Sequence, residues 1–226
     1  MSILTQSGRA AIAASIKEQV IHLAWGNGDA GWESSHRAEK ISFTDDDEIT
    51  LDHQPVKNVK VFTGQTIYQP SIDYIVDSST GVIKRIENSS IAEVTIEYTQ
   101  DTPPEFITSA TLIKEVGRRV VDEMLFCVGD ENGELVTPSG RFKPSNVPTN
   151  NLYLKFTFDF TDAANQVIRE LGVMVGTKVK EGLPTGQRYF EPKDVENPGI
   201  LLVLEHTVPL IRTAATRKTF SFVVTF

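Results

Sequence analysis

The chain has 226 residues, of which 40% are hydrophobic, so it is long enough to bury the core of one good-sized domain or two small ones. Its formal net charge of -8 and isoelectric point near 5.1 argue against a nucleic-acid-binding surface, which would need a basic stripe. The single cysteine, Cys127, excludes an internal disulfide, and no segment has the apolar length of a membrane span, so we expect neither nucleic acid nor a membrane as a partner.

Two segments show the same order of helix, short strand and glycine/aspartate turn. In the first, apolar residues recur every four positions over residues 5–18, which predicts a helix, and the run at residues 20–25 predicts a buried strand. In the second, the same spacing predicts a helix at residues 109–122, followed by a strand at residues 124–128. This weak internal echo suggests that the two helix-strand units pack together.

The first turn, WGNGDAGW at residues 25–32, has three glycines with the spacing of a dinucleotide-binding loop. Such a loop opens a helix, but residues 33–48 have almost no apolar side chain at helical spacing. Asp29 would also repel a phosphate. We therefore interpret the segment as a turn that ends a strand and binds no nucleotide, with Trp25 and Trp32 packed against the body or a neighbouring subunit.

Residues 42–100 change to a period-two pattern of β-branched and aromatic residues that is interrupted by turn signals. The pattern predicts an antiparallel meander of about four or five strands, closed by Pro103 and Pro104. We expect it to be a separable β-subdomain at residues 42–100, inserted into a discontinuous main domain at residues 1–41 and 101–226.

A loop at residues 136–151 leads to the clearest predicted strand, residues 152–160, in which large apolar side chains alternate with polar ones. Further strands are predicted at residues 167–176, 200–211 and 218–226. The last strand ends without a polar tail, so we expect its own sheet or a partner to cover it. The predicted fold is α+β and mainly antiparallel β, with two helix-strand units and an inserted small β-subdomain. The apolar face of the last strand comprises Phe220, Phe222, Val224 and Phe226.

Residues 72–98, IDYIVDSSTGVIKRIENSSIAEVTIEY, resemble a β-module common in tail proteins of tailed bacteriophages. The module has an Asp-Tyr-x-Val-Asp strand, a turn ending in Gly, an Ile-x-Arg strand, a second turn and a final strand ending in Tyr. The family usually has glycines at the second turn and before the last strand, where this chain has Asn88-Ser89-Ser90 and Ala92-Glu93. The matching positions are Asp73, Tyr74, Val76, Asp77, Gly81, Ile83, Arg85 and Tyr98.

The flanks resemble the same group of virion proteins. Residues 4–32 are similar to the opening of phage tail and baseplate proteins, and the segments RELGVMVGT, GLPTGQRYF and TFSFVVTF are similar to their ends. The resemblance covers most of the chain and implies a structural protein of a contractile or otherwise long tail, at the baseplate or the tube end. It implies other tail and baseplate proteins as partners, copies of the chain itself in a symmetric ring, and assembly in the bacterial cytoplasm.

We predict no catalytic, cofactor-binding or metal site. None of the four histidines has a second His or a Cys at metal-ligand spacing. The acidic run at residues 45–48 lacks the glycine and alternating ligands of a calcium loop and is interpreted as a solvated turn. Two of the histidines lie in apolar strands and are expected to be core or interface groups. The histidines are His22, His36, His53 and His206, of which His22 and His206 lie in the apolar strands.

Two other functions remain open. A host-glycan-binding adhesin of the same virion would use Trp25, Trp32 and Tyr153 as platforms on which sugars stack. A hydrolase would need a carboxylate pair such as Glu170 and Glu205 within about 10 Å in a cleft. The leading hypothesis is a non-enzymatic structural protein that acts through its surfaces, because several strands have apolar residues on both faces.

Overall fold

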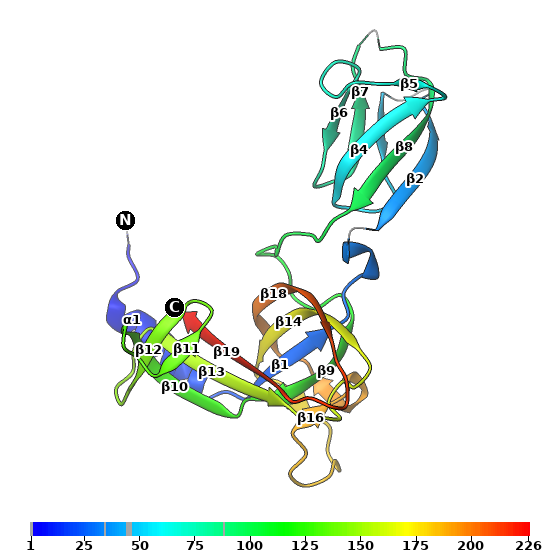
Figure 1. Cartoon of the computed structure of the whole chain (residues 1–226). Helices are drawn as coiled ribbons and strands as arrows, with labels where there is room; N and C mark the ends of the chain where they lie inside the picture. Colours follow the sequence, from blue (N-terminus) through cyan, green and yellow to red (C-terminus); the bar gives the residue numbers. More distant parts are fainter. Residues whose placement is uncertain (1, 34, 44–46, 88) are drawn as a thin grey trace. The chain divides into compact units, whose positions relative to one another are not determined.

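The computed structural model describes residues 2–33, 35–43, 47–87 and 89–226. The chain forms two compact units, which we call the main unit (residues 1–28 and 105–226) and the inserted unit (residues 29–104) (Figure 1). The inserted unit is longer than the expected insertion at residues 42–100. Its additional residues include strand β2 (His36–Ser42), which pairs along its whole length with β8 (Glu93–Gln100).

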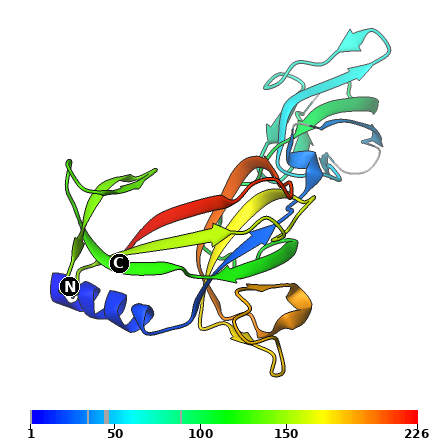
Figure 2. The same ribbon diagram turned by 60° about the horizontal axis from the view of Figure 1, so that its bottom comes forward.

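The first predicted helix and strand are confirmed. Helix α1 (Gln6–Lys17) begins after Thr5, whose hydroxyl accepts the N–H of Gly8 and so satisfies one of the unpaired donors of the first turn. The helix lies beside β10 (Glu123–Gly129) and β13 (Asn151–Phe158), and its Ile16 packs against the core of the main unit (Figure 2). It leads into β1 (Ile21–Gly26), which is buried throughout.

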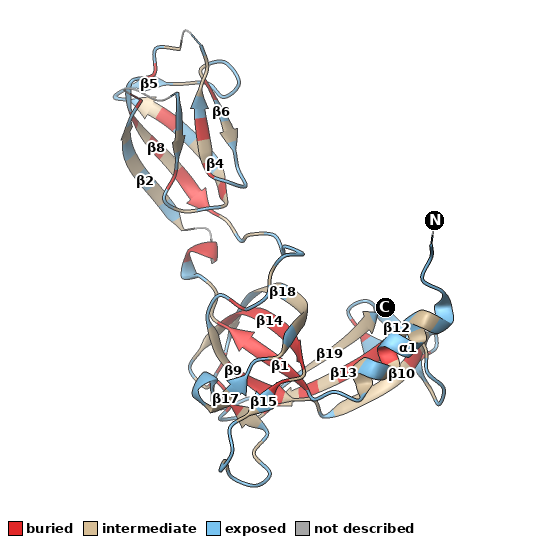
Figure 3. Ribbon diagram, turned by 180° about the vertical axis from the view of Figure 1, so that it is seen from behind, coloured by how far each residue is buried: buried red, intermediate tan, exposed pale blue. Residues whose placement is uncertain are grey.

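Two five-stranded antiparallel sheets form the main unit, and both faces of β1 are covered (Figure 3). Sheet A has the order β16 (Tyr189–Phe190), β9 (Glu115–Val120), β1, β14 (Val167–Val175), β18 (Ile200–Ile211). Sheet D has the order β11 (Leu135–Thr137), β12 (Gly140–Ser145), β10, β13, β19 (Lys218–Thr225). A short ribbon joins β15 (Lys178–Val179) to β17 (Val195–Asn197), and the turn η2 (Pro192–Asp194) precedes β17.

The second predicted helix, at residues 109–122, is wrong. Its C-terminal half is strand β9, which pairs with β1, and a non-helical segment precedes it. The four-residue spacing of Val116 and Val120 fits one face of a helix and one face of a strand equally well. Gly117 disfavours a helix, and a Cβ at this position would meet the ring of Tyr189 on β16. The strand predicted at residues 124–128 is confirmed as β10, but the second helix-strand unit does not exist.

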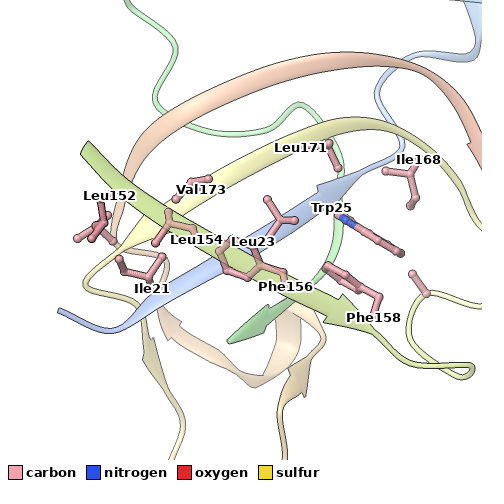
Figure 4. Packing of buried hydrophobic residues seen from close by; sticks show 12 residues of the cluster. Ile21, Leu23, Trp25, Leu152, Leu154, Phe156, Phe158, Ile168, Leu171 and Val173 are labelled. Carbon is pink, nitrogen blue, oxygen red and sulfur yellow. The ribbon is translucent and has the colours of Figure 1, made fainter. Parts of the chain in front are cut away.

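The core of the main unit lies between sheets A and D (Figure 4). Trp25 stacks on Phe158 with ring centroids 3.4 Å apart, and Phe220 meets both rings edge-on. The alternation predicted for residues 152–160 holds as far as Phe158, whereas Phe160 lies beyond the strand and is exposed. The buried members of this core are Ile21, Leu23, Trp25, Leu152, Leu154, Phe156, Phe158, Ala163, Ile168, Leu171, Val173 and Val175.

The described residues of the inserted unit form seven strands in two sheets rather than a single four- or five-stranded meander. One sheet has the order β2, β8, β4 (Val56–Thr63), β5 (Thr66–Ile67), and the other has β3 (Glu48–Thr50), β7 (Val82–Arg85), β6 (Tyr74–Asp77). The period-two pattern of residues 42–100 indicated strands correctly, although β2 begins before this range and both residues of β5 are exposed. The core between the sheets comprises Phe43, Leu51, Val56, Val61, Tyr74, Ile83, Ile91, Val94, Ile96 and Tyr98.

The glycine-rich turn is the place where the chain passes from the main unit to the inserted unit. Gly28 has a φ of 54°, and the one-turn 3-10 helix η1 (Ala30–Glu33) follows it. A Cβ on Gly26 would meet the carboxylate of Glu170, and one on Gly31 would meet the side chain of Gln100. The glycines therefore serve close packing, and the long helix that a dinucleotide loop requires does not follow them.

Candidate assembly surfaces

Buried charged groups hold the loops of the main unit in place. Arg118 is 1% exposed and donates to both carboxylate oxygens of Glu115 at 2.6 and 2.7 Å. It also donates to the Thr177 hydroxyl and the Pro198 carbonyl, at 2.9 and 2.7 Å. One guanidinium therefore ties β9 to the segment that carries the β15–β17 ribbon, through charge-assisted hydrogen bonds.

A second ionic cluster lies at the end of the core where Trp25 and Phe158 stack. Arg119 pairs with the buried carboxylate of Asp162, which also accepts the N–H of Asp159 at 2.7 Å. Arg212 donates to the Asp159 carbonyl at 2.7 Å, and its guanidinium carbon lies 5.2 Å from the Trp25 ring centroid. These contacts lock the β13–β14 and β18–β19 connections and have the character of a structural clamp.

The four histidines do not come together. His22 is buried in β1 and stacks on Phe190 at 5.5 Å, and burial, together with the charge of Arg118, lowers its pKa to about 4. His206 lies on β18, His36 on β2, and His53 beside Tyr98 in the inserted unit. Among the described residues, His, Cys, Asp and Glu form no group that could hold a metal ion. Asp45 and Asp46 of the acidic run lie outside the described residues.

The proposed carboxylate pair of a hydrolase does not share a cleft. Glu170 pairs with His206 across β14 and β18, while Glu205 pairs with Leu171, so the two carboxylates lie on opposite faces of sheet A. Glu170 is fully buried and accepts the backbone N–H groups of Ile113 and Lys114 at 3.1 and 3.3 Å. Its role in the structure is to anchor the segment that precedes β9.

The three aromatic residues proposed as sugar platforms are buried. Trp25, Trp32 and Tyr153 are 0%, 7% and 5% exposed, so none presents a ring to a glycan. Trp25 belongs to the main core, and the Tyr153 hydroxyl lies 3.1 Å from the hydroxyl of Ser221 on β19. The adhesin hypothesis loses the residues on which it rested, whereas the expectation that Trp25 packs the turn against the body is confirmed.

Strand β18 is an outer strand of sheet A whose free edge is protected. Register shifts interrupt its pairing with β14 at two places, and Pro209 lies within one of them. The N–H of His206 points to the free edge, where the carboxylate of Glu105 accepts it at 2.8 Å. Bulges, an edge proline and a capped donor are devices that prevent another strand from pairing.

Strand β19, the outer strand of sheet D, has none of these protections. It pairs with β13 in unbroken register from Lys218 to Thr225. Phe226 donates to the Asn150 carbonyl at 2.9 Å, so the even-numbered residues are bonded to β13. The odd-numbered residues therefore direct their N–H and C=O groups to the free edge, and in the described part of the chain these groups have no backbone partner. They are Thr219, Ser221, Val223 and Thr225.

A groove of about 530 Å³ runs beside this edge. Leu171 and Leu210 of sheet A line it together with residues 218–223 of β19. The turn after β11 closes one side, since β11 approaches β19 without hydrogen bonding to it. The groove is within the range of about 300–1,000 Å³ typical of small-ligand pockets, so it has room for a few side chains of a partner.

The fold and these surfaces are those of an antiparallel β-protein with two units, whose buried charges serve structure. A family model described as "Baseplate wedge 3 tail fiber network component" matches residues 1–53 and 91–226, which is well over half of the chain. The chain belongs to this family and is a structural component of the bacteriophage baseplate, hence of the virion. Its partners accordingly include other tail and baseplate proteins. Comparison with the curated proteins gave no match.

The family match is interrupted within the inserted unit. Residues 54–90, which include β4 to β7, lie outside it, whereas the whole main unit lies inside it. No helix in the described part of the chain is long and apolar enough to cross a membrane. The unprotected edge of β19 and its groove were not visible in the sequence, because alternation identifies a strand but not its position in a sheet.

Proposed function

We propose that this chain is a structural part of the baseplate wedge, or of the adjoining tube end, that acts through protein–protein contacts and not through catalysis. Its main unit contributes the free edge of β19 and the groove beside it. A neighbouring subunit places an extended segment along this edge and extends sheet D by one strand. The observation that carries the proposal is the contrast between the outer strands β18 and β19, because of these two only the edge of β18 is protected.

The chemistry of the edge supports this mode of binding. Four residues of β19 offer alternating donors and acceptors in the spacing of an antiparallel or parallel partner strand. Main-chain hydrogen bonds would provide affinity, and the groove beside Leu171 and Leu210 would select the partner's side chains. An edge of this length that stays uncovered would invite uncontrolled pairing, so a specific occupant also resolves an aggregation hazard.

We propose further that the occupant belongs to another copy of the same chain in a symmetric ring. A head-to-tail contact, in which the edge of one copy receives a different segment of the next, closes into a ring when the rotation permits. This arrangement uses one kind of contact for every interface in the ring. Assembly takes place in the host cytoplasm, before the particle is released.

The test removes one free donor without disturbing the sheet itself. Val223→Pro deletes an N–H that faces the free edge, and Val223→Thr keeps this N–H as the matched control. We expect the proline variant to fold with an unchanged melting curve but to be missing from purified particles, while the threonine variant is incorporated. Phe222→Pro, which removes a bond to β13, should instead fail to fold.

The copy number in particles decides the outcome and can be measured by quantitative mass spectrometry. Normal incorporation of folded Val223→Pro would show that the edge of β19 is not an assembly contact. A photo-cross-linking amino acid at position 223 distinguishes the two parts of the proposal. A cross-link to a different tail protein, rather than to a second copy of this chain, would support the edge contact but contradict the proposed ring.

A further inference from the structure

The groove beside β19 is open because sheet A continues past the last strand of sheet D on this side. Trp25 of β1, Leu171 of β14 and Glu205 of β18 lie next to one another in sheet A, on the face that bears the core. In sheet D, Phe158 of β13 stacks on Trp25, and Phe220 of β19 meets the same ring edge-on. In the described part of the chain no strand of sheet D follows β19. A strand added to the edge of β19 would therefore lie across the groove from β18.

Glu205 and Lys218 are the charged residues that line this groove, and they differ in their contacts. The ammonium group of Lys218 lies 5.9 Å from the centroid of the Phe220 ring, so its charge already has an aromatic neighbour. The Glu205 side chain is exposed, and among the described residues its carboxylate has neither an ion pair nor a hydrogen bond. The groove thus presents one unpartnered negative charge beside the apolar side chains of Leu171 and Leu210.

We propose that the segment bound in the groove places a Lys or Arg side chain against Glu205. In this proposal, which rests on the edge contact of β19 described above, alternate residues of the added strand point to the same side as Phe220 and Phe222. One of these residues supplies the cation, and the next one, two positions along the segment, is apolar and fills the groove beside Leu210. The apolar residue contributes buried area, whereas the ion pair selects the segment and fixes its register.

The charges of the two units indicate which part of the neighbouring copy supplies the segment. Residues 29–104 contain 14 Asp or Glu and 6 Lys or Arg, a net formal charge of -8, which leaves 16 acidic and 16 basic residues in the main unit. A carboxylate in the groove repels the strongly acidic inserted unit of the next copy. The occupant is therefore a Lys- or Arg-containing segment of the neighbouring main unit.

The first experiment captures the occupant in assembled particles. A photo-cross-linking amino acid replaces Thr207, a groove residue of β18, and the cross-linked peptides are identified by mass spectrometry. The expected peptide comes from the main unit of a second copy and has a Lys or Arg two positions from an apolar residue. The same amino acid at the exposed Glu196 of β17 is the control and should not capture this peptide.

The cross-link at position 223 separates this proposal from the edge contact itself. If residue 223 captures a segment that has no Lys or Arg, or one from the inserted unit, the ion pair with Glu205 is wrong and the edge contact stands. If neither position 207 nor position 223 captures a protein, the edge contact is wrong and the ion pair is wrong with it.

The second experiment reverses the charge. Glu205→Lys is compared with Glu196→Lys, which makes the same change at another exposed residue, and each variant competes with an equal amount of the unaltered chain during assembly. Both purified variants should melt as the unaltered chain does. We expect Glu205→Lys to be about tenfold less abundant in particles than Glu196→Lys, because two cations would meet in the groove.

A compensating change distinguishes an ion pair from a general disturbance of β18. When the captured Lys or Arg is replaced by Glu in the same chain as Glu205→Lys, every interface again has opposite charges, and incorporation should return to normal. Equal incorporation of Glu205→Lys and Glu196→Lys would contradict the proposal, and so would a double variant that stays excluded. If Val223→Pro were excluded while Glu205→Lys entered normally, only the role of Glu205 would be wrong.

Discussion

The two units differ in their net charge and in whether their charged residues are buried. The main unit is neutral overall, yet it buries Arg118, Arg119, Arg169 and Arg212, each less than 10% exposed, together with Asp162 and Glu170. The inserted unit carries the whole net charge, and its buried polar residues in the described part of the chain are Thr99 and Gln100. Buried charged residues in the main unit therefore position loops, whereas the described part of the inserted unit buries none of its charged residues.

This difference teaches that charged residues are constrained by packing in one unit and are free of that constraint in the other. Buried ion pairs permit few alternative arrangements, because breaking one leaves an uncompensated charge. A surface charge can be changed at small cost to folding. The interruption of the family match within the inserted unit agrees with this division, since the whole main unit is matched.

The largest effect is expected from removing β19. A chain that ends at Thr219 loses three phenylalanines and a valine that pack against the main core, as well as the pairing with β13 beyond Thr219. This burial is worth very roughly 6–12 kcal/mol, comparable to the net stability of a domain. We expect the main unit not to fold, while the inserted unit, with its own core, keeps a cooperative thermal transition by circular dichroism.

Thr225→Ser is the control for this truncation, because serine retains the hydroxyl that donates to Asn151 at 2.8 Å. Its melting curve should be nearly unchanged. A soluble truncated chain that still enters particles at normal copy number would show that β19 is neither core nor interface.

The next largest effect compares an ion pair from each unit. Asp162→Ala removes the partner of the buried Arg119 and should lower the free energy of unfolding of the main unit by about 3–5 kcal/mol. Glu48→Ala removes the partner of Lys84 at the surface of the inserted unit and should cost less than about 1 kcal/mol. Urea titration of both variants checks the comparison. Equal losses would show that the two units do not differ in the way they use charge.

A pH titration should separate the units as well. Burial holds the pKa of His22 near 4, whereas the unfolded chain has a pKa of 6.5, so the unfolded state binds a proton first as the pH falls. The main unit should therefore lose up to about 3 kcal/mol of stability between pH 6.5 and pH 4, and His22→Leu should abolish this part of the pH dependence.

In the inserted unit, shifted carboxylates dominate instead. A hydrogen bond from the Gly31 N–H lowers the pKa of Asp29, and one from Lys57 lowers that of Asp101, both below the ordinary value of 3.8. Their contribution is present above that value and disappears only at lower pH. If both units lost stability together between pH 6.5 and pH 4, His22 would not be the cause.

The smallest effect is expected from deleting the inserted unit. A chain in which a short Gly/Ser link joins Gly28 to Glu105 should keep the cooperative melt of the main unit, because the deletion removes a unit with its own core. Its formal net charge changes from -8 to zero, which ion-exchange chromatography detects. A second deletion, in which the link joins Lys40 to Glu105, keeps part of β2 but removes its partner strand β8. We expect this chain to be less soluble than the first. Insolubility of both deletions would contradict the two-unit architecture.

Particular elements show why sequence reasoning succeeded for some of the fold and failed elsewhere. Helix α1 and strands β13 and β19 were predicted because each has a regular apolar pattern of one period, and β1 was predicted from its short continuous apolar run. The helix predicted at residues 109–122 was wrong because Val116 and Val120, four positions apart, fit the period of a helix and also the period of a strand. Within the inserted unit the pattern of residues 42–100 indicated strands but missed β2. It did not show the division into two sheets, since alternation reveals a buried face and not the neighbour that covers it.

The candidate surfaces depended still more on long-range pairing. The sequence left Glu170 and Glu205 open as a catalytic carboxylate pair, but the register of β14 against β18 places them on opposite faces of sheet A. From the sequence, Trp32 and Tyr153 could have been aromatic platforms for sugars, but in the fold both side chains are buried. Pro209 indicated an edge strand in principle. Nothing in the pattern of β19 distinguished it from a central strand.

By itself, the sequence determined that the protein is mainly antiparallel β with an N-terminal helix and that it resembles phage tail and baseplate proteins. These properties follow from local periodicity, composition and short motifs, which are encoded within a few neighbouring residues. The tertiary structure alone decided which outer strand stays open and that Glu170 and Glu205 lie on opposite faces of sheet A. Each of these depends on pairings between residues far apart in the chain, and a local pattern carries no information about its distant partner.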